Sequence, residues 1–253
     1  MKQRNVGLAR ALSKLGYCSR SQAFDLIRAG RVRLNGTVRR DPEFPVQMGS
    51  ALIELDGAPV LPADFLYFML NKPRGVVTTA ADEKGRETVY SLLPAGTPWL
   101  GPVGRLDKAS EGLLLLTNDS EWAARITSPA SHLEKAYHVQ VRSSSPDELL
   151  GLLRRGVQSR GELLSVSRVR VLRHGSVHAW LEIVLDEGRN RHIRRMFEEL
   201  DVEVLRLVRV SIGPLGLGDL PKGQARPLTS NEKSWLDRSL KAGAGSLSRL
   251  LNK

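Results

Sequence analysis

A short apolar segment flanked by glycines is the feature that most constrains how this chain can fold. Residues 104–119 read GRLDKASEGLLLLTND, in which four consecutive leucines are followed by a threonine. An apolar run of this length, bounded by turn residues, is typical of a strand buried on both faces. Gly104 and Gly112 allow the backbone before it to turn tightly and to approach a ligand closely. The carboxylate of Asp107 is therefore expected on a loop that the core holds in place.

An aspartate two residues after an arginine is by itself more typical of a surface ion pair. The longer string favours another interpretation, because it resembles the aspartate-bearing motif of the RNA pseudouridine synthases that modify ribosomal RNA at single sites. Three further segments resemble the same family in the same order. They are LNKPRGVVTT at 70–79, KAYHVQV at 135–141, and EGRNRHIRRM at 187–196 followed by LVRVSIGPLGLGDLPKGQARPLT at 207–229. Two positions depart from the family pattern, with Ser120 in place of a glycine and His192 in place of a glutamine.

The resemblance implies an isomerase that converts a uridine within RNA to pseudouridine and needs no cofactor. The base is detached at its nitrogen, turned, and reattached to the same ribose through carbon. The resemblance makes Asp107 the carboxylate that assists, either as a nucleophile on the sugar or by removing a sugar proton to give a glycal, and the sequence leaves both open. Asp119 could compete for this role, but its place just before an expected helix at 121–127 predicts an N-cap.

Two further residues are predicted to act with Asp107. A guanidinium beside a carboxylate favours the ionised carboxylate, and the family's hydrophobic-basic pair, matched to Ile193-Arg194, selects Arg194 for this role. A basic helix face bound to RNA is the alternative for this arginine. Alternation in KAYHVQV places Tyr137 on one face of a strand, where a core tyrosine is the simplest interpretation. The resemblance instead makes Tyr137 the residue that stacks on a flipped uracil.

Other basic side chains near these positions are predicted to hold RNA. Arg105 is expected to fill the space that the flipped base leaves. Lys72 and Arg74 lie in a proline-containing turn and are expected to contact phosphates, with solvated turn charges as the alternative. Phosphate contacts are also expected of Arg189, Arg191 and Arg195. The five histidines of the chain lack metal-ligand spacing, so no metal is expected.

The net charge of the chain comes almost entirely from its N-terminal part. Residues 1–40 contain ten Lys or Arg and one acid, a balance of 10 − 1 = +9 out of the formal +11. A basic cluster this dense is an electrostatic footprint for phosphate and carries little sequence information. No amphipathic helix with a wide aromatic face accompanies it, so a membrane surface is not the expected partner.

The same basic region is patterned like a folded module. Helical spacing predicts a first helix before Gly16, and SRSQ at 19–22 is a capping-box signature that predicts a second. Asn35-Gly36 predicts a hairpin turn, and 51–55 another strand. The string SRSQAFDLIRAGRVRLNG resembles the S4 RNA-binding domain. Its expected RNA-facing side carries Arg20, Arg28, Arg31 and Arg33.

The chain is long enough for one small domain and one larger domain with its own core. The predicted parts are an S4-type RNA-binding domain at 1–58, a linker at 59–64, a pseudouridine synthase domain at 65–240 and a flexible tail at 241–253. Strand-like segments dominate the larger domain, at 66–70, 76–79, 113–117, 137–141, 166–172, 178–185 and 204–212. Helices are expected at 121–127, 146–154, 191–200 and 231–240, without a regular alternation with the strands, which predicts an α+β fold. The resemblance implies a curved mixed, largely antiparallel sheet flanked by helices.

The resulting hypothesis is a site-specific uridine isomerase acting on ribosomal RNA, with the large subunit favoured over the small one. A noncatalytic RNA-binding or ribosome-assembly factor with the same fold is the alternative. The chain has no apolar run of about 18 to 20 residues, and its N-terminus lacks the apolar stretch of a signal peptide. A cytoplasmic location is therefore expected, and the protein is expected to act as a monomer.

Overall fold

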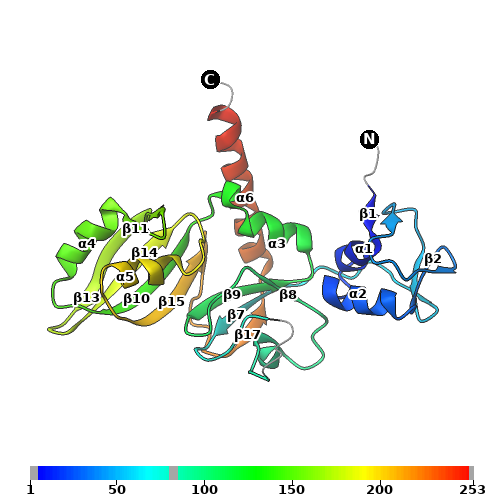
Figure 1. Cartoon of the computed structure of the whole chain (residues 1–253), viewed down its shortest axis with the longest axis horizontal. Coiled ribbons are helices and arrows are strands. Elements are labelled where there is room, and N and C mark those ends of the chain that lie inside the picture. Colours follow the sequence, from blue (N-terminus) through cyan, green and yellow to red (C-terminus); the bar gives the residue numbers. More distant parts are fainter. Residues whose placement is uncertain (1–4, 80–84, 251–253) are drawn as a thin grey trace. The chain divides into compact units, whose positions relative to one another are not determined.

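The computed structural model describes residues 5–79 and 85–250, except for the side chains of residues 242–250. The chain divides into two compact units (Figure 1). One unit consists of Met1–Tyr67, Ala95–Gly101 and Leu116–Ala124. The other consists of Phe68–Pro94, Pro102–Leu115 and Arg125–Lys253. The N-terminal module is therefore joined by two short segments from later in the chain.

The first unit begins with two packed helices, α1 (Leu8–Lys14) and α2 (Arg20–Arg28). The predicted capping box is present at the start of α2. The Ser19 hydroxyl accepts a hydrogen bond of 3.1 Å from the Gln22 backbone N–H, and the Gln22 side-chain oxygen accepts one of 3.0 Å from the Ser19 N–H. These bonds satisfy two N–H groups that the helix itself leaves unpaired, and they fix where α2 begins.

A four-stranded sheet with the order β3-β2-β5-β6 completes the N-terminal module, and β1 and β4 form a separate pair. Asn35 and Gly36 have positive φ angles of 50° and 77° and connect β2 to β3, which confirms the predicted hairpin turn. Buried apolar side chains of the helices and strands, including Leu12, Ile27 and Val32, form one core. The strands are β1 (Val6–Gly7), β2 (Val32–Leu34), β3 (Thr37–Val38), β4 (Pro45–Val46), β5 (Ile53–Leu55) and β6 (Ala58–Pro59).

The largest sheet has nine strands, in the order β13-β14-β10-β15-β9-β7-β17, with β16 paired to β15 and β8 paired to β9. Where the register between its strands is defined, β9 with β15 is parallel and the other pairs are antiparallel. This arrangement confirms the predicted α+β fold with a mixed, largely antiparallel sheet. The strands are β7 (Tyr67–Lys72), β8 (Gly101–Val103), β9 (Glu111–Thr117), β10 (Lys135–Arg142), β13 (Arg168–His174), β14 (His178–Leu185), β15 (Val204–Ile212), β16 (Leu215–Gly216) and β17 (Ala225–Pro227).

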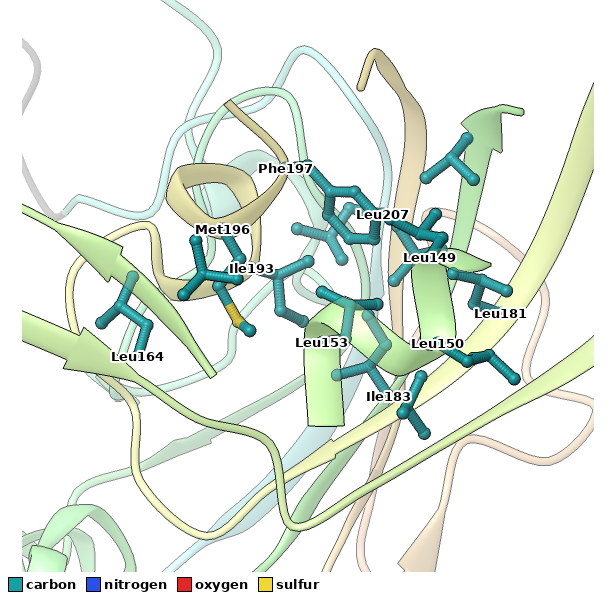
Figure 2. Close-up of a cluster of buried hydrophobic side chains, with 14 of the residues drawn as sticks. Leu149, Leu150, Leu153, Leu164, Leu181, Ile183, Ile193, Met196, Phe197 and Leu207 are labelled. Atoms are coloured by element: carbon teal, nitrogen blue, oxygen red, sulfur yellow. The ribbon is translucent and has the colours of Figure 1, made fainter. Parts of the chain in front are cut away.

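Two helices, α4 (Pro146–Arg155) and α5 (His192–Glu199), pack on one face of this sheet (Figure 1). Figure 2 shows the leucines of α4 and the apolar side chains of α5 meeting over Leu181 and Ile183 of β14. Val139 and Val141 of β10 belong to the same buried cluster. A short hairpin of β11 (Val157–Ser159) and β12 (Glu162–Leu164) separates α4 from β13 in the sequence. This core fixes α5 against the strand that carries Tyr137.

The remaining helices are α3 (Ser120–Thr127), α6 (Ser230–Leu250) and the 3-10 turns η1 (Val89–Leu92) and η2 (Pro129–Ser131). The predicted N-cap at Asp119 is confirmed, because its Oδ1 accepts hydrogen bonds from the backbone N–H groups of Glu121 at 3.2 Å and Trp122 at 2.9 Å. None of the helices in the described part of the chain combines the length and the apolar character that crossing a membrane requires.

Two of the local predictions are wrong. A strand expected at 76–79 is not formed, and Val77 makes instead an isolated parallel bridge with Thr88. The flexible tail expected at 241–253 is helical as far as Leu250, because α6 continues ten residues beyond its expected end. The alanines, leucines and lysine of this segment have high helix propensity, whereas the glycines at 243 and 245 oppose helix formation. Residues 251–253 lie outside the described residues.

Candidate active site

Asp107 lies in the loop between β8 and β9, and β9 anchors that loop. All seven residues of β9 are buried, and Leu113 to Leu116 have no exposed surface, which confirms the strand predicted from the leucine run. Gly112, with a φ of +100°, lies against β15, so that a Cβ added there would be 2.2 Å from the carbonyl oxygen of Arg209. The close approach predicted for this glycine is thus to a neighbouring strand rather than to a ligand.

Lys72 holds the Asp107 loop through hydrogen bonds to backbone carbonyl oxygens. Its Nζ donates hydrogen bonds to the carbonyl oxygens of Pro73 at 3.1 Å, Asp107 at 3.2 Å and Ser110 at 2.9 Å. The predicted phosphate contact of Lys72 is wrong, because this side chain is completely buried. Burial lowers the pKa of Lys72 to about 8, while the negative charges of Asp107 and Glu111 act in the opposite direction. The lysine of the LNKPRG turn therefore holds the loop that carries the predicted catalytic carboxylate.

Arg194 reaches the same loop from α5. Its Nη2 donates a 3.0 Å hydrogen bond to the carbonyl oxygen of Ala109, and its Nε is buried without a hydrogen-bond partner among the described residues. Burial lowers the pKa of Arg194, repulsion from Arg191 adds to this effect, and attraction to Asp107 opposes it. The structure does not form the predicted direct ion pair within the described residues. Arg194 instead contacts the backbone two residues beyond Asp107.

A cavity of about 520 Å³ brings the three predicted catalytic residues together. Asp107, Tyr137 and Arg194 all line it, from the β8–β9 loop, β10 and α5 respectively. A cavity of this size is within the range that accepts a small ligand or a single nucleotide. The predicted RNA-binding residues Arg105, Arg189 and Arg191 also line it. Lys135 and Arg209 are part of the lining too, although neither was predicted as a site residue.

Two other predicted phosphate contacts have different environments. Arg195 is only 6% exposed, and it donates hydrogen bonds to the Ser159 carbonyl oxygen at 2.8 Å and to Glu162 at 3.0 and 3.1 Å. The prediction that Arg195 contacts phosphate is therefore wrong, because this guanidinium fixes α5 to the β11–β12 hairpin. Arg74 is exposed, and its Nη1 lies 3.4 Å from the carbonyl oxygen of Leu205. It remains accessible to RNA.

The four arginines predicted to face RNA from the N-terminal module are all exposed. Arg33 alternates with the buried residues of β2, so it points away from the core of the module. Arg31 forms a two-bond ion pair with Asp56, at 3.0 and 2.5 Å, and this pair lowers the pKa of Asp56. Arg28 lies over the ring of Phe24, with 5.7 Å between the guanidinium carbon and the ring centroid. Arg20 begins α2.

Two family models match the chain. Residues 66–199 match the model described as RNA pseudouridylate synthase, and residues 6–52 match the S4 domain. The first match contains the Asp107 loop, β10 and α5, and the second contains α1, α2 and the hairpin of β2 and β3.

Individual proteins resemble the chain over most of its length. "Ribosomal large subunit pseudouridine synthase B" of Bacillus subtilis (strain 168) is 36% identical over 233 residues, which cover 89% of this chain and 93% of the relative. An "Uncharacterized RNA pseudouridine synthase" of Aquifex aeolicus (strain VF5) is 35% identical over 93% of this chain and 95% of its own. A solved structure described as "Crystal structure of pseudouridylate synthase" is 31% identical, with a TM-score of 0.63, and covers 91% of this chain and 99% of its own.

Proposed function

Because this chain belongs to the RNA pseudouridine synthases and carries an N-terminal S4 domain, we propose that it isomerises a specific uridine of large-subunit ribosomal RNA to pseudouridine. Family membership makes the protein an isomerase that acts on RNA, so the alternative of a noncatalytic RNA-binding factor is not retained. The choice of ribosomal RNA is supported by the relative from Bacillus subtilis, whose name specifies the large subunit. The observation that carries the proposal is the shared cavity of Asp107, Tyr137 and Arg194.

The cavity suits chemistry on a nucleotide taken out of its RNA helix. A uridine inside a helix must be flipped before its glycosidic bond can be reached, and an aromatic face can hold the extruded base. Tyr137 supplies that face on β10, and Asp107 supplies a carboxylate to the lining of the same cavity. The exposed Arg105 lies two residues before Asp107, where its planar guanidinium can replace the flipped base in the RNA stack.

Two cations, Lys72 and Arg194, act on the Asp107 loop through its backbone. Lys72 donates to the carbonyl of Asp107 itself, and Arg194 donates to that of Ala109. Attraction to the Asp107 charge also opposes the lowering of both pKa values that burial causes. Among the described residues, neither cation forms an ion pair with the Asp107 carboxylate, which leaves that group available to act on the sugar. This arrangement positions the reacting group in advance, which is how enzymes reduce the cost of reorganisation.

The S4 domain is proposed to dock the ribosomal RNA while the cavity acts on one nucleotide. Its exposed arginines give an affinity that depends on the phosphate backbone and falls with salt. The protein would then recognise its target through contacts with the flipped base and with the neighbouring nucleotides.

Mapping pseudouridines in ribosomal RNA from cells with and without this protein tests the proposal. We expect the loss of one site or a small group of sites in the large-subunit RNA. Wild-type protein should restore each site, as should the control Asp147→Asn, which changes an exposed carboxylate on α4. Asp107→Asn should not restore them. An unchanged map would overturn the choice of ribosomal RNA, and sites lost only from small-subunit RNA would overturn the choice of subunit.

A further inference from the structure

Two basic side chains line the cavity but have no part in the proposed reaction. Arg209 on β15 is only 6% exposed, and its Nε donates a 2.7 Å hydrogen bond to the carbonyl oxygen of Leu113. Its Nη2 is buried and has no partner among the described residues. Lys135 at the start of β10 is half-buried in the same lining. A buried donor without an acceptor is costly, so Nη2 requires an explanation.

The sheet places this pair next to the residue proposed to hold the base. Arg209 is the direct cross-strand partner of Tyr137, and Lys135 precedes Tyr137 by two residues on the same face of β10. Two residues along a strand span roughly 7 Å. A group held by Lys135 and Arg209 would therefore lie within one nucleotide of a base stacked on Tyr137.

The balance of charge in the cavity favours an anion. Its lining contains six Lys or Arg residues and three acidic ones, and two of the basic residues are already paired, Arg189 with Glu187 and Arg191 with Glu198. Burial lowers the pKa of Lys135, and repulsion from Arg209 lowers it further, while Asp186 opposes both effects. Lys135 and Arg209 thus repel each other with incomplete compensation. An uncharged uracil carbonyl could accept one hydrogen bond but would leave this repulsion in place.

We propose that Lys135 and Arg209 form a subsite for the backbone phosphate of the nucleotide whose base stacks on Tyr137. The Arg209 guanidinium donates to one phosphate oxygen, and the Lys135 ammonium binds another. The hydrogen bond to Leu113 holds the guanidinium in place before RNA arrives. Because Leu113 belongs to β9, the strand that follows the Asp107 loop, the subsite fixes the distance between the target ribose and the carboxylate. In its use of RNA, this inference rests on the proposed function.

A neutral phosphate at one position tests the subsite directly. The substrate is an RNA carrying the mapped target uridine, with or without a methylphosphonate on its 5′ side, compared by binding and by single-turnover rate. A hydrogen bond to a charged group contributes about 1.5–3 kcal/mol, so we expect the methylphosphonate to lower the RNA affinity of wild-type protein by about 10-fold to 100-fold. Arg209→Met and Lys135→Met should bind unmodified RNA correspondingly less well. In these two variants, the methylphosphonate should lower the RNA affinity by less than about 3-fold further.

The control Arg168→Met removes an exposed arginine outside the cavity lining, and it should remain as sensitive to the methylphosphonate as wild type. If the methylphosphonate lowers the RNA affinity of Arg209→Met by the same factor as that of wild type, the two changes act independently, and Arg209 does not bind this phosphate. Should Arg209→Met fail to fold, Lys135→Met gives the same comparison, since Lys135 makes no such bond to β9.

A second test does not depend on knowing the target RNA. Lys135 in the full-length protein is labelled by reductive methylation in the presence of uridine 5′-monophosphate or uridine, and its modification is followed by mass spectrometry. The monophosphate should protect Lys135, uridine should not, and Arg209→Met should abolish the protection. Equal effects of the two compounds would overturn the subsite even if the ribosomal pseudouridine is found. Protection without any ribosomal pseudouridine would overturn only the proposed RNA.

Discussion

The basic residues of the N-terminal module and those around the cavity differ in what surrounds them. Arg20, Arg28 and Arg33 are exposed, and solvent and salt reach them freely. Lys72 and Arg209 are buried and donate to backbone carbonyls. Exposed charges act over a distance and can replace one another, whereas a buried donor is tied to one geometry. Charge therefore locates RNA binding in the first region, but hydrogen-bond geometry determines the chemistry in the second.

The largest effect is expected at the carboxylate itself. Asp107→Asn should reduce the single-turnover rate by roughly 10³-fold or more, because an amide can neither attack the sugar nor accept its proton. RNA affinity should change by less than about 3-fold, because the carboxylate does not bind a phosphate. Rates measured with enzyme in excess over the RNA separate the two quantities. A variant that reacts at the wild-type rate would remove Asp107 from the mechanism.

Lys72→Met should impair both catalysis and folding. It leaves the carbonyls of Pro73, Asp107 and Ser110 without their donor, which should cost about 2–4 kcal/mol of unfolding free energy. The rate at saturating RNA should fall about 100-fold as the loop loses its fixed geometry. Denaturant unfolding and single-turnover kinetics measure the two effects. A stable variant of normal activity would show that the buried lysine is dispensable and would weaken the contrast between the two regions.

The lowered pKa of Lys72 also gives an expected pH dependence. In the folded protein Lys72 loses its proton near pH 8, while in the unfolded chain it keeps it until about pH 10.4. The unfolded state binds more protons in this window, so the contribution of Lys72 to stability rises with pH between the two values. Activity should fall above about pH 8, because the positive charge under the Asp107 loop is lost. A single-turnover rate that stays flat from pH 7 to 9.5 would contradict this assignment.

Arg194→Leu should lower the single-turnover rate at saturating RNA by roughly 30-fold to 100-fold, because the loop loses the hydrogen bond to Ala109. Arg191→Leu is the matched control three residues earlier. The Arg191 guanidinium pairs with Glu198 and not with the Asp107 loop, so its removal should leave the saturated rate unchanged. RNA binding should weaken a few-fold, because one positive charge is lost. If the two variants behave alike, the positions of these arginines relative to the loop do not determine their roles.

Replacing Arg20, Arg28 and Arg33 together with glutamine should change binding alone. Removing one arginine–phosphate interaction reduces the slope of log affinity against log salt by about 0.7 to 0.9, so the slope should fall by about 2 to 3. The saturated rate should stay within about 2-fold of wild type, since none of the three lines the cavity. Titrations at several salt concentrations measure the slope. A lower saturated rate would show that the module does more than dock the RNA.

The smallest expected effect is at His192, where the chain departs from the family pattern. This residue is buried, and burial lowers its pKa. The unfolded state therefore binds more protons below about pH 6.5, and stability falls as the pH decreases from there, by at most about 1.4 kcal/mol per pH unit. His192→Gln should flatten this dependence, while His174→Gln, which changes an exposed histidine, should not. Unfolding measured from pH 7 to pH 5.5 decides the matter.

Much of the fold was predictable because local pattern and tertiary structure agree. The expected strands at 178–185 and 204–212 have the observed bounds, and the capping box at Ser19 fixes α2 as predicted. Alternation on β10 correctly placed Tyr137, and the same alternation could have identified Lys135, which shares its face. The resemblance to the family predicted three site residues, and the structure places all three in the lining of one cavity.

The burial of cations was not predictable in the same way. Lys72 donates to carbonyls 35 and 38 residues away, and Arg195 to Ser159, 36 residues away. No local pattern reports such partners, so both side chains were predicted to contact RNA phosphate. Arg209 was missed because both faces of β15 carry basic as well as apolar residues, so alternation does not show which face is buried. The direction of the Arg209 side chain also depends on the bulge opposite Tyr137.

The close approach of Gly112 to Arg209 limits how this enzyme can be varied. A single methyl group at position 112 would collide with the carbonyl of the neighbouring strand and force β9 and β15 apart. The Asp107 loop leads directly into β9, and Arg209 of the proposed phosphate subsite lies on β15, so moving these strands apart would also change the distance between the carboxylate and the subsite. Libraries that diversify the cavity side chains could alter substrate choice while this position stays glycine. The hydrogen atom of Gly112 thus sets a spacing that no other amino acid can reproduce.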